Sequence, residues 1–233
     1  MIGSAALVAT DIDFAYPNGV QVIEGWSGEF ERGAMSALTG PSGSGKSTLL
    51  YLLGLMHRQS AGEIVVGGVP TARMGDGNRA VLRAGQFGFV FQDAALDPTR
   101  TVMDNVIETA LYRGQPRKQA VGRAQELLEE FGVELRSTHR PGQVSGGQAQ
   151  RIALCRALLA DPSFILADEP TGNLDPLTRD VVVAAFRRRA AAGACVVIAT
   201  HDVEVLAACD TETPLGGVPL RELGAAGPVG GDL

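Results

Sequence analysis

Residues 40–47 read Gly-Pro-Ser-Gly-Ser-Gly-Lys-Ser, and they join an apolar, strand-like run at 35–39 to a helix-like run at 47–53. The segment fits the pattern G-x-x-x-x-G-K-[ST], whose glycines let the backbone curl until successive N–H groups point at one spot. At a helix N-terminus these groups carry partial positive charge, which suits a phosphate. The order of strand, loop and helix predicts an α/β protein. The alternative is a flexible glycine turn before a helix.

Lys46 and Ser47 complete this pattern. Lys46 supplies a compact full charge to the β- and γ-phosphates of a nucleotide, and the Ser47 hydroxyl is placed to bind Mg²⁺. Lys46 and Lys118 are the only lysines in the chain, so Lys46 is not a chance draw from a lysine-rich surface. The pattern therefore predicts a nucleotide site that also holds Mg²⁺.

Two adjacent acids, Asp168 and Glu169, follow the short apolar run at 164–167. Such a run, bounded by turn signals, is typical of a buried parallel strand, and ligands gather where parallel strands end. We expect Asp168 to reach Mg²⁺ directly or through water, and Glu169 to orient and deprotonate the attacking water. The alternative is a helix N-cap followed by a first-turn charge.

His201 emerges at the end of another apolar, β-branched run, at 194–200. A neutral imidazole at this position can hydrogen-bond the γ-phosphate and hold the water or Glu169 in place. A histidine at a strand end is by itself more often structural. The expected shared location with the phosphate loop and the two acids favours the catalytic interpretation.

Residues 145–148, Ser-Gly-Gly-Gln, offer a second place for a phosphate about 100 residues after the first. Ser145 is a good N-cap for the helix-forming run that follows, and Gly146 and Gly147 expose N–H groups at a positive helix end. This site has no lysine and no metal-binding carboxylate of its own. An ordinary capped helix after a glycine turn is the alternative.

These motifs, in this order, resemble those of the ATP-binding-cassette (ABC) ATPases, and the resemblance covers nearly all of the chain. Residues 40–47 look like the Walker A loop, 144–148 like the signature, and 165–169 like the Walker B strand with its catalytic glutamate. Val144 departs conservatively from the leucine that is most frequent in the family. The resemblance implies an α/β fold: a RecA-like P-loop NTPase core with an antiparallel β subdomain and an inserted α-helical subdomain.

The resemblance gives a role to three further positions. Gln92 matches the Q-loop glutamine, which touches Mg²⁺ and water and senses the membrane partner, and Asp175 lies in the match to the D-loop. Tyr16 stands where the family places an aromatic ring that stacks on adenine, although it can also be an ordinary strand-edge aromatic. The expected catalytic residues are Glu169, His201 and Gln92, and the expected metal ligands are Ser47, Gln92 and Asp168. The residues expected to bind ATP are Tyr16, Gly40, Pro41, Ser42, Gly43, Ser44, Gly45, Lys46, Ser47, Thr48, Ser145, Gly146, Gly147, Gln148 and Asp175.

In the ABC family, the signature of one subunit closes over ATP held by the Walker loop of the other. The resemblance therefore implies a dimer, a homodimer or a heterodimer, around two ATP, which drives a separate transmembrane permease from the cytoplasmic, inner face of the membrane. Within the family the chain looks most like the lipoprotein-release, macrolide-export and cell-division subgroup. The alternative is a soluble ABC-type ATPase of DNA repair, translation or cluster assembly, but the chain has no inserted coiled coil or zinc module.

The sequence also predicts how one nucleotide-binding domain spans residues 1–233. Residues 1–92 and 160–212 form the ATP-binding core with its β subdomain, 93–159 the helical subdomain, and 213–233 a Gly/Pro-rich segment whose last ten or so residues are loosely ordered. Strand-like stretches at 5–13, 21–30 and 64–69 predict the antiparallel sheet. Helix-like stretches lie at 101–112, 117–131 and 148–159. The strip at 96–106 is the expected contact with the membrane partner.

Composition agrees with this interpretation. The chain has 233 residues, of which 45% are hydrophobic and 20% charged, as in a globular protein with a substantial core. No apolar run approaches the ~20 residues that a membrane-spanning helix needs, and the N-terminus does not resemble a signal peptide. The net charge of −6 argues against a nucleic-acid partner. Cys155, Cys195 and Cys209 have no C-x-x-C spacing and are expected to be reduced core thiols.

Overall fold

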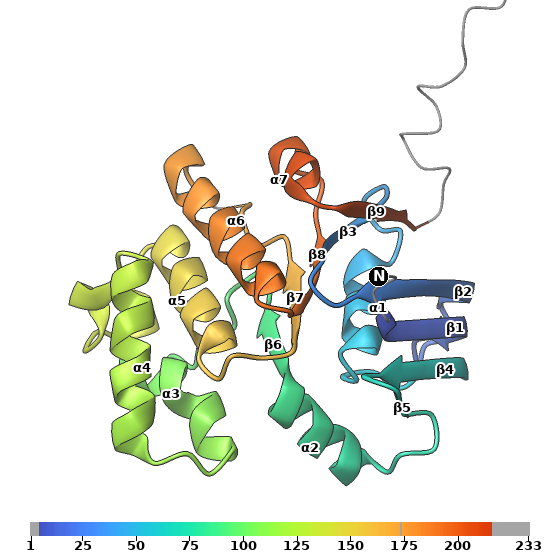
Figure 1. Ribbon diagram of the computed structural model, residues 1–233, viewed down its shortest axis with the longest axis horizontal. Helices are drawn as coiled ribbons and strands as arrows, with labels where there is room; N and C mark the ends of the chain where they lie inside the picture. Colours follow the sequence, from blue (N-terminus) through green and yellow to red (C-terminus); the bar gives the residue numbers. More distant parts are fainter. Residues whose placement is uncertain (1–4, 173, 216–233) are drawn as a thin grey trace, which may run out of the picture.

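Two β-sheets form the centre of the structure, a computed structural model that describes residues 5–172 and 174–215 (Figure 1). The first sheet is antiparallel, with the order β2 (Gln21–Glu31), β1 (Ala5–Ala15), β4 (Ala61–Val66) and β5 (Val69–Pro70). The second sheet is parallel, with the order β6 (Phe87–Val90), β7 (Phe164–Asp168), β8 (Cys195–Ala199), β3 (Met35–Thr39) and β9 (Thr211–Pro214).

The antiparallel sheet contains the three strands that the sequence predicts, with one difference. The stretch predicted as a strand at 64–69 is divided between β4 and β5. Gly67 and Gly68, with φ of 56° and 85°, form the turn between them, because glycine enters the left-handed region without the steric cost of a Cβ. The antiparallel pairing of Val66 with Val69 then follows directly from the turn.

The parallel sheet is covered on both faces, which explains its continuous apolar strands. Ile165, Val196 and Ile198 face one hydrophobic core, whereas Leu166 and Val197 on the same strands face another. All five residues are fully buried. Because β6, β7, β8 and β3 run parallel, their carboxyl ends meet at one edge of the sheet, where residues from all four strands can act together.

Seven α-helices surround the sheets in the described part of the chain. In Figure 1, three of them form a group at the side of the molecule opposite the antiparallel sheet: α3 (Val102–Tyr112), α4 (Arg117–Glu130) and α5 (Gly146–Leu158). The others are α1 (Lys46–Leu53), α2 (Asp76–Gln86), α6 (Pro176–Ala191) and α7 (Val203–Ala208), and two 3₁₀ turns occupy Glu134–Arg136 and Pro141–Gln143. The core that lies between the parallel sheet and the helices α3 to α6 is the larger of the two.

Helix boundaries depart from the predicted ones by one or two residues, mostly because of capping. The stretch predicted at 101–112 begins at Val102, since the Thr101 side chain accepts a hydrogen bond from the Asp104 N–H and caps the helix. The stretch predicted at 148–159 begins two residues earlier, at Gly146, because Ser145 is its cap. Helix α2 was not predicted, since its exposed residues carry few apolar side chains and no strong periodic signal.

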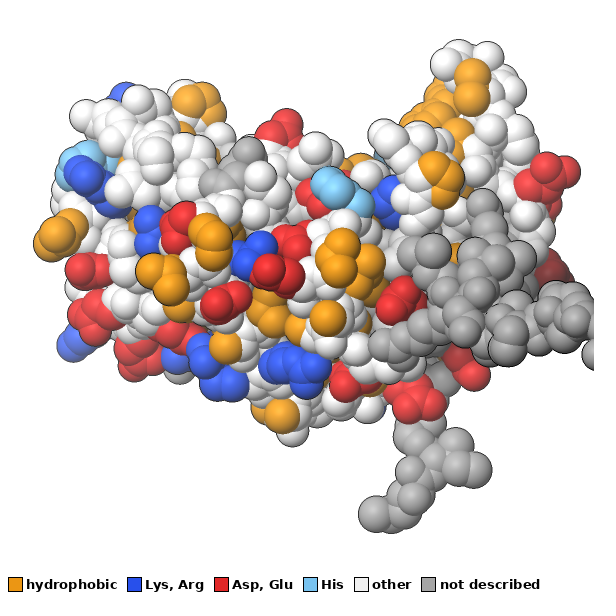
Figure 2. Space-filling model, turned by 90° about the horizontal axis from the view of Figure 1, so that it is seen from above, with side chains coloured by type: hydrophobic (Ala, Val, Ile, Leu, Met, Phe, Trp, Pro, Cys, Tyr) orange, Lys and Arg blue, Asp and Glu red, His pale blue; other side chains and the backbone are white. Residues whose placement is uncertain are grey.

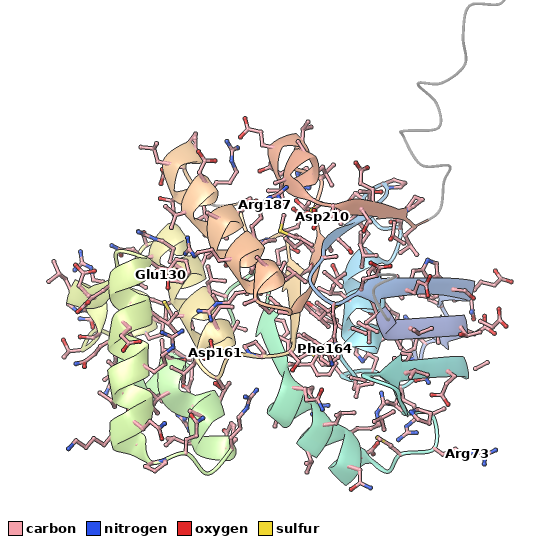
Figure 3. The ribbon with its side chains drawn as sticks, viewed as in Figure 1. Arg73, Glu130, Asp161, Phe164, Arg187 and Asp210 are labelled. Carbon is pink, nitrogen blue, oxygen red and sulfur yellow. The ribbon has the colours of Figure 1, made fainter. Side chains whose placement is uncertain are left out.

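Three consecutive arginines of α6 connect this helix to neighbouring segments. Arg187, labelled in Figure 3 together with Glu130 and Asp161, donates to the backbone oxygen of Ala208. Arg188 pairs with Glu130 at the end of α4, and Arg189 pairs with Asp161 before β7. Figure 2 shows acidic and basic side chains interspersed over the face seen from above, so this face holds no extended basic surface.

The remaining predictions concern the cysteines, the membrane and the end of the chain. Cys155, Cys195 and Cys209 are free and buried, and burial raises the pKa of each thiol. Among the described residues, none of the helices combines the length and the apolar character that crossing a bilayer requires. The C-terminal segment predicted to be loosely ordered lies outside the described residues, except that residues 213 and 214 belong to β9.

Candidate active site

The loop at 40–45 leads from β3 into α1 and uses glycine where another residue would clash. Gly40 has a φ of 147°, and a Cβ added to it would lie 2.5 Å from the backbone oxygen of Leu215. Gly45 has a φ of 92°, and its Cβ would lie 2.9 Å from a side-chain carbon of Val22. No side chain caps the N-terminus of α1. The loop therefore presents backbone N–H groups at a positive helix end.

Lys46 holds this loop in its curled shape. Its Nζ donates hydrogen bonds to the backbone oxygens of Gly40 at 2.8 Å and of Pro41 at 2.9 Å. Both bonds join a full charge to neutral carbonyls, and a phosphate oxygen is a stronger partner for an ammonium group. The lysine is thus positioned at the mouth of the loop, where it can exchange its partners for a ligand.

Asp168 is the last residue of β7 and is almost fully buried, with 2% of its surface exposed. Its carboxylate accepts hydrogen bonds from the hydroxyl groups of Ser47 and Tyr51, the latter at 3.4 Å. Burial raises the pKa of Asp168 above its ordinary value, and burial together with Asp168 raises the pKa of Tyr51 to about 12. A buried carboxylate next to a serine hydroxyl is a donor set that suits a hard cation.

Glu169 directly follows Asp168 but turns away from it. Its backbone has a φ of 44°, an uncommon conformation for a residue with a side chain, and its N–H bonds the Ala199 oxygen at 2.9 Å. Thr200 donates to Glu169 Oε2 at 3.1 Å, and His201 Nδ1 lies 2.7 Å from Oε1. The Glu169 side chain is 16% exposed and the His201 side chain 82%, so the carboxylate is oriented by its neighbours while the imidazole reaches solvent.

One cavity of about 810 Å³ gathers these groups at the carboxyl edge of the parallel sheet. β3 supplies the phosphate loop, β7 the two acids, β8 His201 and β6 Gln92. Tyr16 also borders the cavity, and its hydroxyl lies 3.0 Å from Oγ1 of Thr48. The predicted residues that line the cavity are Tyr16, Gly40, Pro41, Ser42, Gly43, Gly45, Lys46, Ser47, Thr48, Gln92, Asp168, Glu169 and His201.

The residues predicted around the second phosphate position do not line this cavity. Ser145 and Gly146 are exposed, and Ser145 caps α5 through a capping box: its Oγ accepts from the Gln148 N–H at 3.3 Å, and the Gln148 side chain accepts from the Ser145 N–H at 3.0 Å. Asp175 caps α6, with its carboxylate bonded to the N–H of Thr178 at 3.0 Å. Within one chain, the two phosphate positions are therefore separate.

Three residues of the site escaped the sequence interpretation. Val22 lines the cavity beside Gly45, while Thr200 and Tyr51 bond the two carboxylates. Tyr51 stands four residues after Ser47 on α1, so helical spacing places it on the same face. Thr200 directly precedes His201 at the strand end. Both signals are present in the sequence, whereas Val22 depends on how the two sheets pack.

Comparison with known proteins agrees with the geometry. The family model of the ABC transporter matches residues 23–172, more than half of the chain. The chain belongs to the ABC transporter family. An uncharacterized ABC transporter ATP-binding protein of Thermotoga maritima is 46% identical over 187 residues, 80% of each chain. The lipoprotein-releasing system ATP-binding protein LolD of Paramagnetospirillum magneticum is 43% identical over 82% of this chain and 85% of its own.

Solved structures extend this agreement to the fold. The dimeric structure of MJ0796, a bacterial ABC transporter cassette, matches with a TM-score of 0.86 at 30% identity, over 90% of this chain and 94% of that one. The predicted fold, with its P-loop NTPase core, and the predicted ABC-type ATPase activity are confirmed, as is the resemblance to the lipoprotein-release subgroup. The similarities favour the transport ATPase over the alternative of a soluble repair or translation ATPase.

Proposed function

We propose that this ABC ATPase forms a head-to-tail dimer in which Ser145 and Gly146 of each copy complete the nucleotide cavity of the other. The observation that carries the proposal is the separation of the two phosphate positions: one cavity holds the loop, the lysine and both acids, and the capped end of α5 lies outside it. The dimeric arrangement of the MJ0796 cassette supports it.

The chain's own residues account for substrate binding. The ring of Tyr16, at the edge of the cavity, offers a π-face for adenine, and the N–H groups at the start of α1 face the phosphates. Lys46 exchanges its two loop carbonyls for phosphate oxygens. The gain in charge pairing compensates for the hydrogen bonds that the loop gives up.

The donor set at Asp168 fits Mg²⁺. Among the described residues, no group of three or more His, Cys, Asp or Glu side chains is placed to hold a metal alone. Mg²⁺ commonly uses one or two protein oxygens and takes the others from water and substrate phosphates. Ser47, Asp168 and Gln92 would supply the protein oxygens. When bound, the ion would neutralise charge that develops on the phosphate oxygens.

Glu169 is the candidate base for the attacking water. Thr200 and His201 hold its carboxylate from two sides, which leaves one proton-accepting oxygen in a fixed direction. In our proposal Glu169 takes the proton as the water oxygen attacks the γ-phosphorus and the bond to the ADP oxygen breaks. His201, largely exposed at the cavity mouth, orients both the carboxylate and the γ-phosphate.

The partner that the ATPase drives is, in our proposal, a separate permease at the inner face of the cell membrane. The relative LolD is named as the ATP-binding protein of a lipoprotein-releasing system, which supports a membrane machine of this subgroup. A groove of about 420 Å³ between β6, α2, α3 and α5 starts beside the Gln92 segment and is lined by Phe87, Phe89 and Phe91. This groove and the neighbouring strip at 96–106 are the surface that we expect a permease segment to contact.

A mixing experiment tests the shared site. Lys46→Ala removes the charge of the cavity, and Ser145→Asp keeps a helix cap but places a negative charge toward the partner's phosphate. Each variant alone should lose ATP hydrolysis, whereas a mixture should regain part of it, because each mixed dimer contains one cavity with an intact lysine and an intact serine. Phosphate release is measured for both variants and for the mixture. A mixture as inactive as its components, with mixed dimers demonstrated by mass spectrometry, would contradict the proposal.

A further inference from the structure

A second cavity, of about 350 Å³, lies between the loop that follows α1 and the helix α2. It takes no part in the nucleotide site. Its walls combine a short apolar segment with three guanidinium groups and one carboxylate: Leu55, Met56, His57, Arg58, Asp76, Arg79 and Arg83. A cavity that is lined this densely by arginine is built to receive negative charge.

The arginine groups in this cavity, which we call the arginine pocket, bond mainly backbone oxygens. Arg58 bonds the oxygens of Ala72 at 3.0 Å and Met74 at 2.7 Å. Arg83 bonds the oxygen of Leu55 at 2.9 Å. Backbone oxygens satisfy N–H groups but do not neutralise a charge, so most of the positive charge of the pocket remains uncompensated.

Arg79 is the most constrained of the three. It is 3% exposed, and its Nη2 donates to the His57 oxygen at 2.6 Å, while its Nη1 is buried without a partner. A buried donor without an acceptor is unfavourable, and a buried guanidinium beside another is more so. Burial first, and the charge of Arg58 second, lower the pKa of Arg79.

The only carboxylate on the wall of this cavity is too exposed to balance the charge. Asp76 lies 2.9 Å from Arg58, and its side chain is 94% exposed. An ion pair in such contact with water is strongly screened. Three guanidinium groups against one solvated carboxylate leave room for a second negative group, placed deeper, next to Arg79 and Arg83.

We propose that the arginine pocket binds one carboxylate group, and that an acidic side chain of the docked permease segment supplies it. The inference rests on the proposed function, because the pocket and the aromatic groove share Met56 and Arg83 and form one continuous surface. A segment with apolar side chains along the groove and an acid at its end matches this surface in both character and charge. The planar fork of an arginine pairs with a carboxylate through two parallel hydrogen bonds.

The first experiment uses the protein alone and does not depend on a permease. Acetate is titrated at constant ionic strength against chloride, and the ¹H–¹⁵N signals of the arginine side chains are followed. We expect a saturable shift of the Arg79 signal that is absent from the double variant Arg58→Ala, Arg83→Ala. The control is Arg73→Ala, which removes an exposed arginine of the neighbouring loop that points away from the body of the molecule (Figure 3). No saturable shift in the unsubstituted protein would overturn the site.

The second experiment uses the complex with the membrane protein that co-purifies with the unsubstituted chain. Arg58→Glu should lower the yield of the complex about tenfold or more, since a repelled charge replaces an attracted one. The ATPase rate and the melting temperature of the isolated chain should stay unchanged. Replacement of the responsible acid of the permease by arginine should restore the complex with Arg58→Glu, and Arg73→Glu should leave it intact.

The outcomes separate this inference from the proposed function. If no membrane protein co-purifies with the unsubstituted chain, the proposed function fails, and the acetate titration still decides whether the pocket binds a carboxylate. If the complex forms equally well with Arg58→Glu, the permease acid is refuted while the proposed function stands. If the chain binds vesicles of phosphatidylglycerol, and Arg58→Glu but not Arg73→Glu abolishes that binding, a lipid headgroup is the occupant and the inference is wrong.

Discussion

The N-termini of α1 and α5 are both preceded by glycine-containing loops and both suit a phosphate, yet they are built differently. At α1 the cap residue is Gly45, in a left-handed conformation, and no side chain covers the first N–H groups. At α5 the cap is Ser145, and the capping box with Gln148 satisfies the first turn internally. The first end lies in a deep cavity with two carboxylates, and the second is exposed and lies outside that cavity.

This difference shows which end performs the chemistry and which end recognises it. The open end of α1 depends on a ligand to occupy its N–H groups, so it is stable only as part of a binding site. The end of α5 needs no ligand to fold. The cap uses an acceptor lone pair of the Ser145 hydroxyl, so its O–H remains a donor for another chain's phosphate. A Cβ added to Gly146 would meet nothing within 4 Å, so packing inside this chain does not require the glycine.

The largest effect that we expect comes from Glu169→Gln, which tests whether the α1 cavity alone contains the chemistry. Glutamine still accepts a hydrogen bond from Thr200 but cannot take a proton from water. Hydrolysis should fall about 10²–10⁴-fold, while ATP binding persists. With turnover stopped, ATP and Mg²⁺ should hold two chains together, which size-exclusion chromatography with light scattering detects. A monomer that persists under these conditions would count against the shared site.

A smaller loss should follow from changes at Ser145, which test the α5 end. Ser145→Ala and Ser145→Asp should both lower hydrolysis, by up to about 10²-fold, with ATP binding to one subunit nearly intact. Only alanine removes the helix cap, so only Ser145→Ala should lower the free energy of unfolding, by about 1 kcal/mol. Denaturant unfolding and nucleotide titration separate the two effects. Loss of ATP binding in the monomer would mean that Ser145 acts within its own chain.

The same two regions show what a sequence can predict. The α1 region is local: strand, loop and helix follow one another, so the pattern at 40–47 predicts the place of each residue. Asp168, Glu169 and His201 are far apart in the chain, but each ends a buried strand, and the parallel sheet brings strand ends together. The resemblance to a family places Gln92 and Tyr16, which no local pattern would single out.

Other features depend on packing that no pattern encodes. Val22 reaches the cavity because the antiparallel sheet packs beside the phosphate loop, and helix α2 forms although its sequence has a weak apolar stripe. The left-handed backbone of Glu169 also has no sequence signal, since glutamate rarely adopts this conformation. The hydrogen bonds to Ala199 and Thr200 that stabilise it come from another strand.

The contrast between the two ends also predicts a dependence of stability on pH. Burial raises the pKa of Asp168, so the folded chain holds this proton more tightly than the unfolded chain does, and stability falls as the pH rises from the unfolded value of 3.8 through the raised one. Asp168→Asn removes this cost. Without nucleotide, it should raise the stability at pH 7 by about 1 kcal/mol, or roughly 2–4 °C in melting temperature.

Thermal unfolding over a pH series checks this prediction. The gain from Asp168→Asn should shrink as the pH approaches 3.8, because the aspartate is then neutral in both states. The matched change at the other end is Asp175→Asn, where the carboxylate caps α6 and its pKa is lowered by Thr178. That variant should show no gain at pH 7. Equal gains from both changes would mean that burial of charge does not distinguish the cavity from the exposed caps.

The smallest expected effect concerns Tyr16 at the edge of the cavity. Its hydroxyl lies 3.0 Å from the Thr48 hydroxyl, in a partly buried position, and its ring packs edge-on against Phe14 at 5.0 Å between ring centres. Tyr16→Phe keeps the ring and removes one hydrogen bond, so the Kd for ATP should change less than about threefold. Tyr16→Ala removes the stacking face and should weaken ATP about tenfold, because base–aromatic stacking contributes about 1–3 kcal/mol. Titration with ATP and with inorganic triphosphate, which has no base, distinguishes the two roles. If Tyr16→Ala weakens both ligands equally, the ring supports the loop through Thr48 and does not contact adenine.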